Sequence, residues 1–178
     1  MSDRGIEQAA RLAGRLGREQ IGSILCSTLL RATMTAEHLS SVSNVPLTLR
    51  ADLQERNYGD IRGIAYEELG VNILDSDYEP PGGETWREFH QRVAGVWRHI
   101  ERLVLDTSPN SPEAIVVVTH GLVLHALVSR HFDVAHLDGV PHSFANTSVT
   151  VVDPKPPWRV AMLNCTSHLS DTPLSEAC

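Results

Sequence analysis

The chain has 178 residues and a formal net charge of −7, from 15 Lys and Arg against 22 Asp and Glu, and 42% of it is hydrophobic. The length suits a single domain over residues 1–178. The composition excludes disorder, collagen-like structure and coiled coil for most of the chain. A nucleic-acid-binding protein needs a basic surface, so the acidic balance argues against one. A small anionic ligand in a locally basic pocket stays compatible with it.

The sequence also predicts where the protein works. Its longest uninterrupted apolar run, Ala114–Val118, is far shorter than the roughly 20 residues of a membrane helix. The first residues lack the apolar stretch of a signal peptide. The three cysteines, Cys26, Cys165 and Cys178, form no C-x-x-C pair and favour reduced thiols. Together these features predict a cytoplasmic protein without a membrane partner.

Two helices and two strands are predicted in the first fifty residues. Apolar side chains at helical spacing predict a surface helix over residues 6–16. The short apolar run at residues 21–26 predicts a buried strand. Ser27 is placed to cap a helix over residues 28–39. Residues 47–49 are a weaker strand candidate.

The middle of the chain combines an irregular stretch with a long helix. Residues 51–84 are rich in glycine and turn-forming proline, with a short helix predicted at 65–69. Thr85 and Glu88 have the spacing of a capping box. The helix that they begin carries an apolar face as far as residue 104, so it is the longest predicted element.

The last third of the chain alternates strands with one helix. Residues 114–119 are apolar up to the final position, which predicts a strand buried on both faces. A helix follows at 122–131, and strands are predicted at 148–153 and 158–163. The polar tail, 166–178, is expected to fray. Strands that alternate with helices indicate an α/β domain with a largely parallel sheet.

His120 and Gly121 directly follow the apolar strand and begin the next helix. In open α/β sheets, ligands bind beyond the carboxyl ends of the strands. Backbone N–H groups at the helix N-terminus favour an anion there, and Gly121 lets the backbone approach it closely. A histidine satisfied by a backbone carbonyl is the structural alternative, but the position favours a functional role.

Two further side chains fit an anion site only in combination with His120. Arg31 lies in the first turn of the helix after the first strand, where a guanidinium reaches an oxyanion over the sheet edge. Glu55 lies in a glycine-punctuated loop and has the chemistry of a general acid. Taken alone, each is better explained as a solvated surface residue.

The sequence favours neither a metal nor a nucleotide cofactor. It has nine histidines but no H-E-x-x-H motif. Four of the histidines are five or six residues apart, which does not stack them on one helical face: His120, His125, His131 and His136. The motifs G-x-S-x-G, G-x-x-x-x-G-K-[ST] and G-x-G-x-x-G are absent. We therefore expect no metal site and no cofactor.

Six segments, in order along the chain, resemble the histidine phosphatase superfamily, the phosphoglycerate mutase-like proteins. The segment STLLRATMTA resembles the family's S-P-L-x-R-A-x-x-T-A, with Thr28 in place of the proline. LQERNYGDIRG resembles L-x-E-x-x-x-G-x-x-x-G, PGGET resembles P-G-G-E-S/T, and VVTHG resembles V-V-x-H-G. The matching segments, including GIEQA and NTS, are residues 5–9, 27–36, 53–63, 81–85, 117–121 and 146–148.

The resemblance implies a fold and a chemistry. The fold is a three-layer α/β sandwich with a mostly parallel sheet. The chemistry is phosphoryl transfer through a phosphohistidine on a small phosphorylated molecule, without metal or cofactor. His120 is implied as the second active-site histidine, Glu55 as the proton donor, and Arg31 with Gly121 as phosphate-binding residues. Cationic donors aimed at developing negative charge suit this reaction.

One family feature is missing from the sequence. The family begins with a strand ending in Arg-His-Gly, whose histidine is the nucleophile, and no Arg-His-Gly occurs here. The Arg-His pairs are Arg98-His99 and Arg130-His131, and neither precedes glycine. We therefore expect an N-terminally truncated domain, inactive as it stands. Loss of this central strand should leave its neighbours unpaired and apolar surface exposed.

Three hypotheses follow. The first is a phosphatase or mutase whose true N-terminus lies upstream. We favour it because Glu55, which matters only to catalysis, is still present in the sequence. The second is a non-catalytic protein that binds phosphorylated molecules through Arg31 and His120. The third is an interaction protein that completes its sheet with another chain or with its own copy. The sequence leaves the substrate, mutase against phosphatase activity, and a homodimer open.

Overall fold

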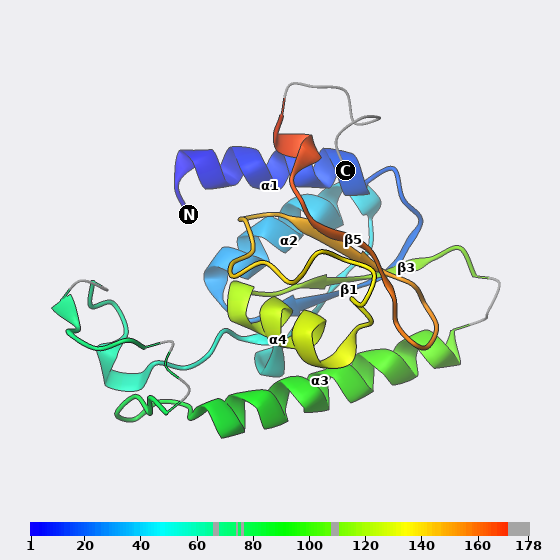
Figure 1. Ribbon diagram of the computed structural model, residues 1–178. Helices are drawn as coiled ribbons and strands as arrows, with labels where there is room; N and C mark the ends of the chain where they lie inside the picture. The colour runs from blue at the N-terminus through cyan, green and yellow to red at the C-terminus, as the bar shows by residue number, and fades with distance from the viewer. Residues whose placement is uncertain (66–67, 74, 76, 108–110, 171–178) are drawn as a thin grey trace.

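The computed structural model describes residues 1–65, 68–73, 75, 77–107 and 111–170 (Figure 1). Helices lie on both sides of a central sheet, and together they form three layers (Figure 1). Two helices cover one face and two cover the other. The helices are α1 (Asp3–Leu16), α2 (Leu30–Ser43), α3 (Trp86–Asp106) and α4 (Gly121–His131).

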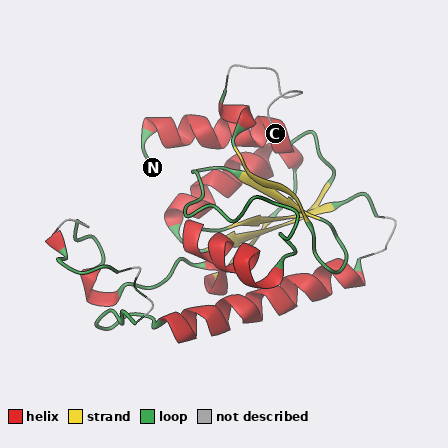
Figure 2. Ribbon diagram, viewed as in Figure 1, coloured by secondary structure: helices red, strands yellow, loops and turns green. Residues whose placement is uncertain are grey.

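Within the described residues, the strands fall into two separate sheets, and Figure 2 shows the strands in yellow. In the first, β1 (Ile21–Ser27) lies between β2 (Leu47–Arg50) and β3 (Ala114–Val118), and all three are parallel. In the second, β4 (Val149–Val152) pairs antiparallel with β5 (Val160–Cys165). The predicted α/β class with a largely parallel sheet is confirmed.

Successive side chains of the central strands enter two different cores. Ile24 and Cys26 of β1 pack with α1 and α2 on one face of the sheet. Leu25, between them, packs with α3 and α4 on the other face. Because side chains of a strand alternate between its faces, a β1 strand that is apolar on both faces ties the two helical layers together.

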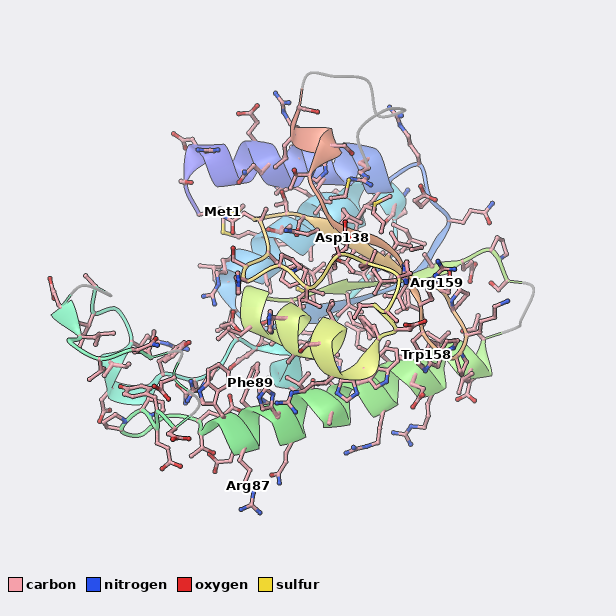
Figure 3. All side chains as sticks on the ribbon, viewed as in Figure 1. Met1, Arg87, Phe89, Asp138, Trp158 and Arg159 are labelled. Carbon is pink, nitrogen blue, oxygen red and sulfur yellow. The ribbon has the colours of Figure 1, made fainter. Side chains whose placement is uncertain are left out.

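Helix α3 has the capping box that the sequence predicts. The Thr85 hydroxyl accepts a hydrogen bond from the Glu88 N–H at 3.2 Å, and the Glu88 carboxylate accepts one from the Thr85 N–H at 2.9 Å. Phe89, on the same helix, is fully buried in the core that α3 shares with α4. Arg87 points away from the domain into solvent (Figure 3).

The start of α2 differs from the prediction. The helix begins at Leu30, its N-cap is Leu29, and no side chain caps it. Ser27 is the last residue of β1, and its hydroxyl accepts a hydrogen bond from the Leu29 N–H and contacts His120 instead. Ser27 therefore lies where β1 ends, and its hydroxyl is hydrogen-bonded to His120, the residue just beyond the neighbouring strand.

The end of the described chain is more ordered than expected. Residues of η4 (Ser167–Leu169) pack on α1, so this part of the predicted fraying tail is structured. Arg15 donates to the Ser167 hydroxyl at 3.3 Å rather than facing solvent. Residues 171–178 lie outside the described residues, as do 66–67 of the short helix predicted at 65–69.

The structure bears on two further predictions, one about the redox state of the cysteines and one about membrane helices. Cys26 is a free, buried thiol, whereas Cys165 is disulfide-bonded, so the reduced state holds for Cys26 and is wrong for Cys165. Among the helices of the described residues, none is both long and apolar enough to cross a membrane.

Candidate active site

The carboxyl ends of β1 and β3 meet at one edge of the sheet, because the two strands are parallel neighbours. Ser27 ends β1 and is fully buried. His120 follows β3 as the N-cap of α4. The His120 Nε2 atom lies 2.7 Å from the Ser27 hydroxyl. A hydrogen bond therefore joins the two strand ends and fixes the imidazole.

The environment of His120 keeps its ring neutral. Burial, together with the smaller effect of the positive charges of Arg31 and Arg92, lowers the pKa of His120 to about 4. At neutral pH, the imidazole therefore carries no charge, and the ring nitrogen that does not contact Ser27 is left for a second hydrogen bond.

Arg31 supplies the unpaired cation of this edge. It lies in the first turn of α2, and its side chain is exposed. Within the described part of the chain its guanidinium has neither a hydrogen bond nor an ion pair. Its charge nevertheless lowers the pKa of both His120 and Glu55. Arg31 is thus close to both groups and available to an anion.

Glu55 lies at the N-terminus of α4, although it comes from the loop after η1 (Ala51–Leu53). Its carboxylate accepts hydrogen bonds from the N–H groups of Leu122 at 3.2 Å and Arg56 at 3.1 Å. Burial raises the pKa of Glu55, and these hydrogen bonds and Arg31 oppose that rise. A carboxyl group with a raised pKa suits a proton donor.

Two arginines that the sequence analysis did not single out hold the Glu55 loop in place. Arg92 of α3 forms an ion pair with Glu84 at 2.7 Å and donates to the carbonyl oxygens of Asp52 and Gln54. Arg56 is 2% exposed and donates to the carbonyl oxygens of three residues. These residues are Ile73, Tyr78 and Glu84.

The glycines of the two loop motifs allow these loops to interlock. Gly59 has φ +54°, and an added Cβ there would collide with the Pro81 carbonyl oxygen. Gly83 is equally enclosed, since a Cβ would lie 2.6 Å from the Asn57 carbonyl oxygen. Only glycine fits both positions, so the resemblance of these segments to family motifs has a packing reason.

A cavity of about 1320 Å³ extends from this edge between β3 and β4, and we refer to it as the interstrand cleft. Its lining includes Arg31, Glu55, His120 and Gly121, so all four predicted site residues meet there. Asn146 of the NTS segment also lines it. Arg31 and Asn146 are 115 positions apart in the sequence, and the fold brings both to the same cleft.

Along its length the interstrand cleft is bounded by two strand edges that have no partner in the described residues. β3 pairs only with β1, and β4 pairs only with β5. The expectation of unpaired neighbours is therefore confirmed. β3 is half-buried, with Ala114 exposed, and the prediction of complete burial on both faces is wrong. The reason is the open cleft beside it.

The described residues hold no group of three or more His, Cys, Asp or Glu side chains placed to bind a metal ion. The chemistry available at the cleft is therefore read from the side chains themselves: one exposed guanidinium, one neutral imidazole and one carboxyl group with a raised pKa.

Comparison with known proteins gives one family. The sequence model of the histidine phosphatase superfamily (branch 1) matches residues 1–166. Phosphoglycerate mutase-like protein 4 of Arabidopsis thaliana is 30% identical over 187 aligned positions, covering 97% of this chain and 77% of the relative. The uncharacterized phosphatase PhoE of Bacillus subtilis is 29% identical, covering 83% of this chain and 72% of its own length.

Solved structures agree in fold. Bacillus stearothermophilus YhfR superposes with a TM-score of 0.79 at 26% identity, covering 96% of this chain and 87% of the other. A mycobacterial glucosyl-3-phosphoglycerate phosphatase in complex with inorganic phosphate gives a TM-score of 0.77 at 23% identity, covering 96% and 89%. Both share this three-layer α/β fold, which is the phosphoglycerate mutase-like fold that the resemblance implied.

This chain belongs to the histidine phosphatase superfamily, branch 1. Its function is of the phosphatase or mutase type that characterises this superfamily.

Proposed function

We propose that the protein binds small phosphomonoesters at the carboxyl edge of β1 and β3 and acts in their hydrolysis or transfer. The observation that carries the proposal is the meeting of Arg31, Glu55 and His120, from three separate elements, in one cleft. The names of two similar proteins support it, since one is called a phosphatase and another was solved with inorganic phosphate.

Each residue has a role in this proposal. Arg31 binds two phosphoryl oxygens through its guanidinium fork. His120 hydrogen-bonds a third oxygen, and Gly121 lets the phosphoryl group approach the N-terminus of α4. Glu55 gives its proton to the oxygen of the departing alcohol, which its raised pKa favours.

We further propose that residues 1–178 alone do not turn over a phosphomonoester. The family route needs a nucleophilic histidine in Arg-His-Gly, and the sequence has none. The interstrand cleft indicates where an additional strand carrying that histidine would fit. A strand between β3 and β4 would pair with both open edges, and if it ran parallel to β3 its carboxyl end would lie beside Arg31 and His120.

A second candidate function is favoured by the same open edges. In it the protein is a non-catalytic phosphoryl-binding protein, or one that completes its sheet with a strand of another chain or of its own copy. Unpaired strand edges are templates for such pairing. This candidate and the first share the phosphoryl site and differ in whether the added strand carries a nucleophile.

The test uses the 178-residue chain with an aryl phosphate. We expect no hydrolysis above background, together with a rise of melting temperature in millimolar phosphate or vanadate, because a ligand that binds only the folded state stabilises it. Arg31→Gln should lose the rise, and Arg87→Gln, at an outward-pointing arginine (Figure 3), should keep it.

Two results would overturn the proposal. An unchanged melting temperature in the unmodified chain would contradict a formed phosphoryl site. Strong turnover that survives His99→Ala and His131→Ala but disappears with His120→Ala would show that the nucleophile is His120 and that the assigned role is wrong.

A further inference from the structure

One hydroxyl joins the segment that carries His120 to the segment that carries Glu55. Thr119 lies between the end of β3 and His120, the N-cap of α4. Its hydroxyl donates a hydrogen bond to the Leu53 carbonyl oxygen at 2.9 Å, across 66 positions of sequence. Leu53 ends η1, just before Gln54 and Glu55. The proposed proton donor and the proposed phosphoryl-binding histidine are therefore each close in sequence to one end of this bond.

The backbone of residues 52–54 is held from two sides. Each of its three carbonyl oxygens accepts a hydrogen bond from a side chain. Arg92 of α3 donates to the first and the third, at 2.7 and 2.8 Å, and Thr119 donates to the second. The Leu53 side chain is fully buried in the core that α3 shares with α4. Arg92 thus ties this backbone to α3, and Thr119 ties it to the junction of β3 and α4.

A second hydrogen bond closes a ring between the same two segments. The Glu55 carboxylate accepts from the Leu122 N–H at 3.2 Å, and Leu122 follows Thr119 closely, in the first turn of α4. His120, which lies between them in sequence, is fixed separately by its 2.7 Å contact with the Ser27 hydroxyl. Loss of the Thr119 hydroxyl therefore opens the ring on the side of Glu55 and leaves the imidazole in place.

We propose that Thr119 is a positioning residue for the proton transfer, because its hydroxyl holds the Glu55 carboxylate against the N-terminus of α4, beside His120. Thr119 touches no reacting atom in this role and acts through Glu55. The inference rests on the proposed function, which makes Glu55 the proton donor. A proton donor has to lie within hydrogen-bond reach of the departing oxygen, so a small displacement of its carboxyl group lowers the rate. The role requires a hydroxyl, which serine also supplies, whereas valine has the shape of threonine without the donor.

The consequence of this role is measurable at Glu55. Burial is the main cause that raises the pKa of Glu55, and the hydrogen bond from the Leu122 N–H opposes this rise. In Thr119→Val, Arg92 still holds the backbone in its buried place, but the carboxylate is no longer kept on Leu122. The opposing hydrogen bond is then lost, and the pKa of Glu55 rises further. A purely structural role for Thr119 would lower the stability of the fold and leave this pKa unchanged.

The test is an NMR titration of the Glu55 carboxyl carbon in the 178-residue chain and three variants. Thr119→Val should raise the pKa of Glu55, and Thr119→Ser should restore its value in the unmodified chain. Thr107→Val is the matched control, because the Thr107 hydroxyl, also partly buried, donates to the Leu103 carbonyl oxygen at 2.8 Å at the end of α3. We expect it to lower the urea midpoint about as much as Thr119→Val does, with the pKa of Glu55 unchanged.

Phosphate binding separates this inference from the proposed function. Inorganic phosphate should bind Thr119→Val within about twofold of the unmodified chain, because Arg31 and His120 are in place. If phosphate does not bind the unmodified chain, the proposed function fails and the positioning role fails with it. If phosphate binds but the pKa of Glu55 is the same in Thr119→Val, or is not restored in Thr119→Ser, the phosphoryl site stands and the positioning role is wrong.

One measurement needs no variant and applies even if Thr119→Val does not fold. In the unmodified chain, the Leu122 amide resonance should shift with the same pKa as the Glu55 carboxyl carbon, because the two groups are hydrogen-bonded. A Leu122 amide that does not follow the titration of Glu55 would mean that the ring is not formed, and the inference would be overturned.

Discussion

The two edges of β3 differ in backbone hydrogen bonding. One edge is paired along its length with β1, whereas the other faces the interstrand cleft across from β4. His120 leaves the end of the same strand, and its hydrogen-bond partner Ser27 belongs to the paired side. The groups proposed to bind phosphate are thus positioned by the paired part of the sheet, and the proposed additional strand would lie in the open part.

The largest effect expected from this difference is in amide hydrogen exchange. Every second backbone N–H of β3 faces the interstrand cleft, while β1 is paired on both sides. Unpaired amides exchange through local openings of almost no cost, but paired core amides need an opening of several kcal/mol. We expect alternate β3 amides to exchange at least about 10³-fold faster than those of β1. Uniform protection along β3 would show that its outer edge is covered.

Arg31→Gln tests the paired side. Loss of a charged, two-pronged hydrogen bond costs about 1.5–3 kcal/mol, so we expect the affinity for inorganic phosphate to fall about 10- to 100-fold in calorimetric titration. Arg31 is exposed, so the fold should be unaffected. The matched control Arg87→Gln should stay within about twofold of the unmodified chain. An equal loss in both variants would mean general electrostatic attraction instead of a site.

Ser27→Ala sharpens the comparison at the joint between the two strand ends. The substitution leaves the His120 Nε2 atom without its hydrogen-bond partner in a half-buried place. We expect the free energy of unfolding in urea to fall by about 1–3 kcal/mol. Ser41→Ala, on an exposed part of α2, is the control and should change it by less than about 0.5 kcal/mol. Equal effects would remove the structural role given to Ser27.

Much of the candidate site was predictable because it follows from sheet geometry. Apolar runs give the strands, and parallel strands place their carboxyl ends at one edge, so a histidine after β3 and an arginine after β1 have to be near each other. Glu55 was assigned to the same site only because its segment resembles a family motif. The catalytic and binding roles of these residues stay predictions.

The rest depends on contacts between distant positions. Arg92 and Arg56 read as ordinary arginines in the sequence, and their partners lie up to 40 residues away in loops whose course no local pattern fixes. Ser27 has the residue type of a helix cap, but a tertiary hydrogen bond to His120, 93 residues away, decides its role. A capping box, by contrast, is purely local, and it was predicted correctly at Thr85 and Glu88.

The central claim is that Arg31 and His120 bind one phosphoryl group together, and NMR titration of the His120 imidazole tests it most directly. In the free chain we expect this ring to titrate with a pKa of about 4. Saturating phosphate should raise that pKa, because a nearby phosphate anion favours the protonated ring, and Arg31→Gln should prevent most of the rise. A ring that titrates near 6.5 in the free chain, or one that does not respond to phosphate, would contradict the account.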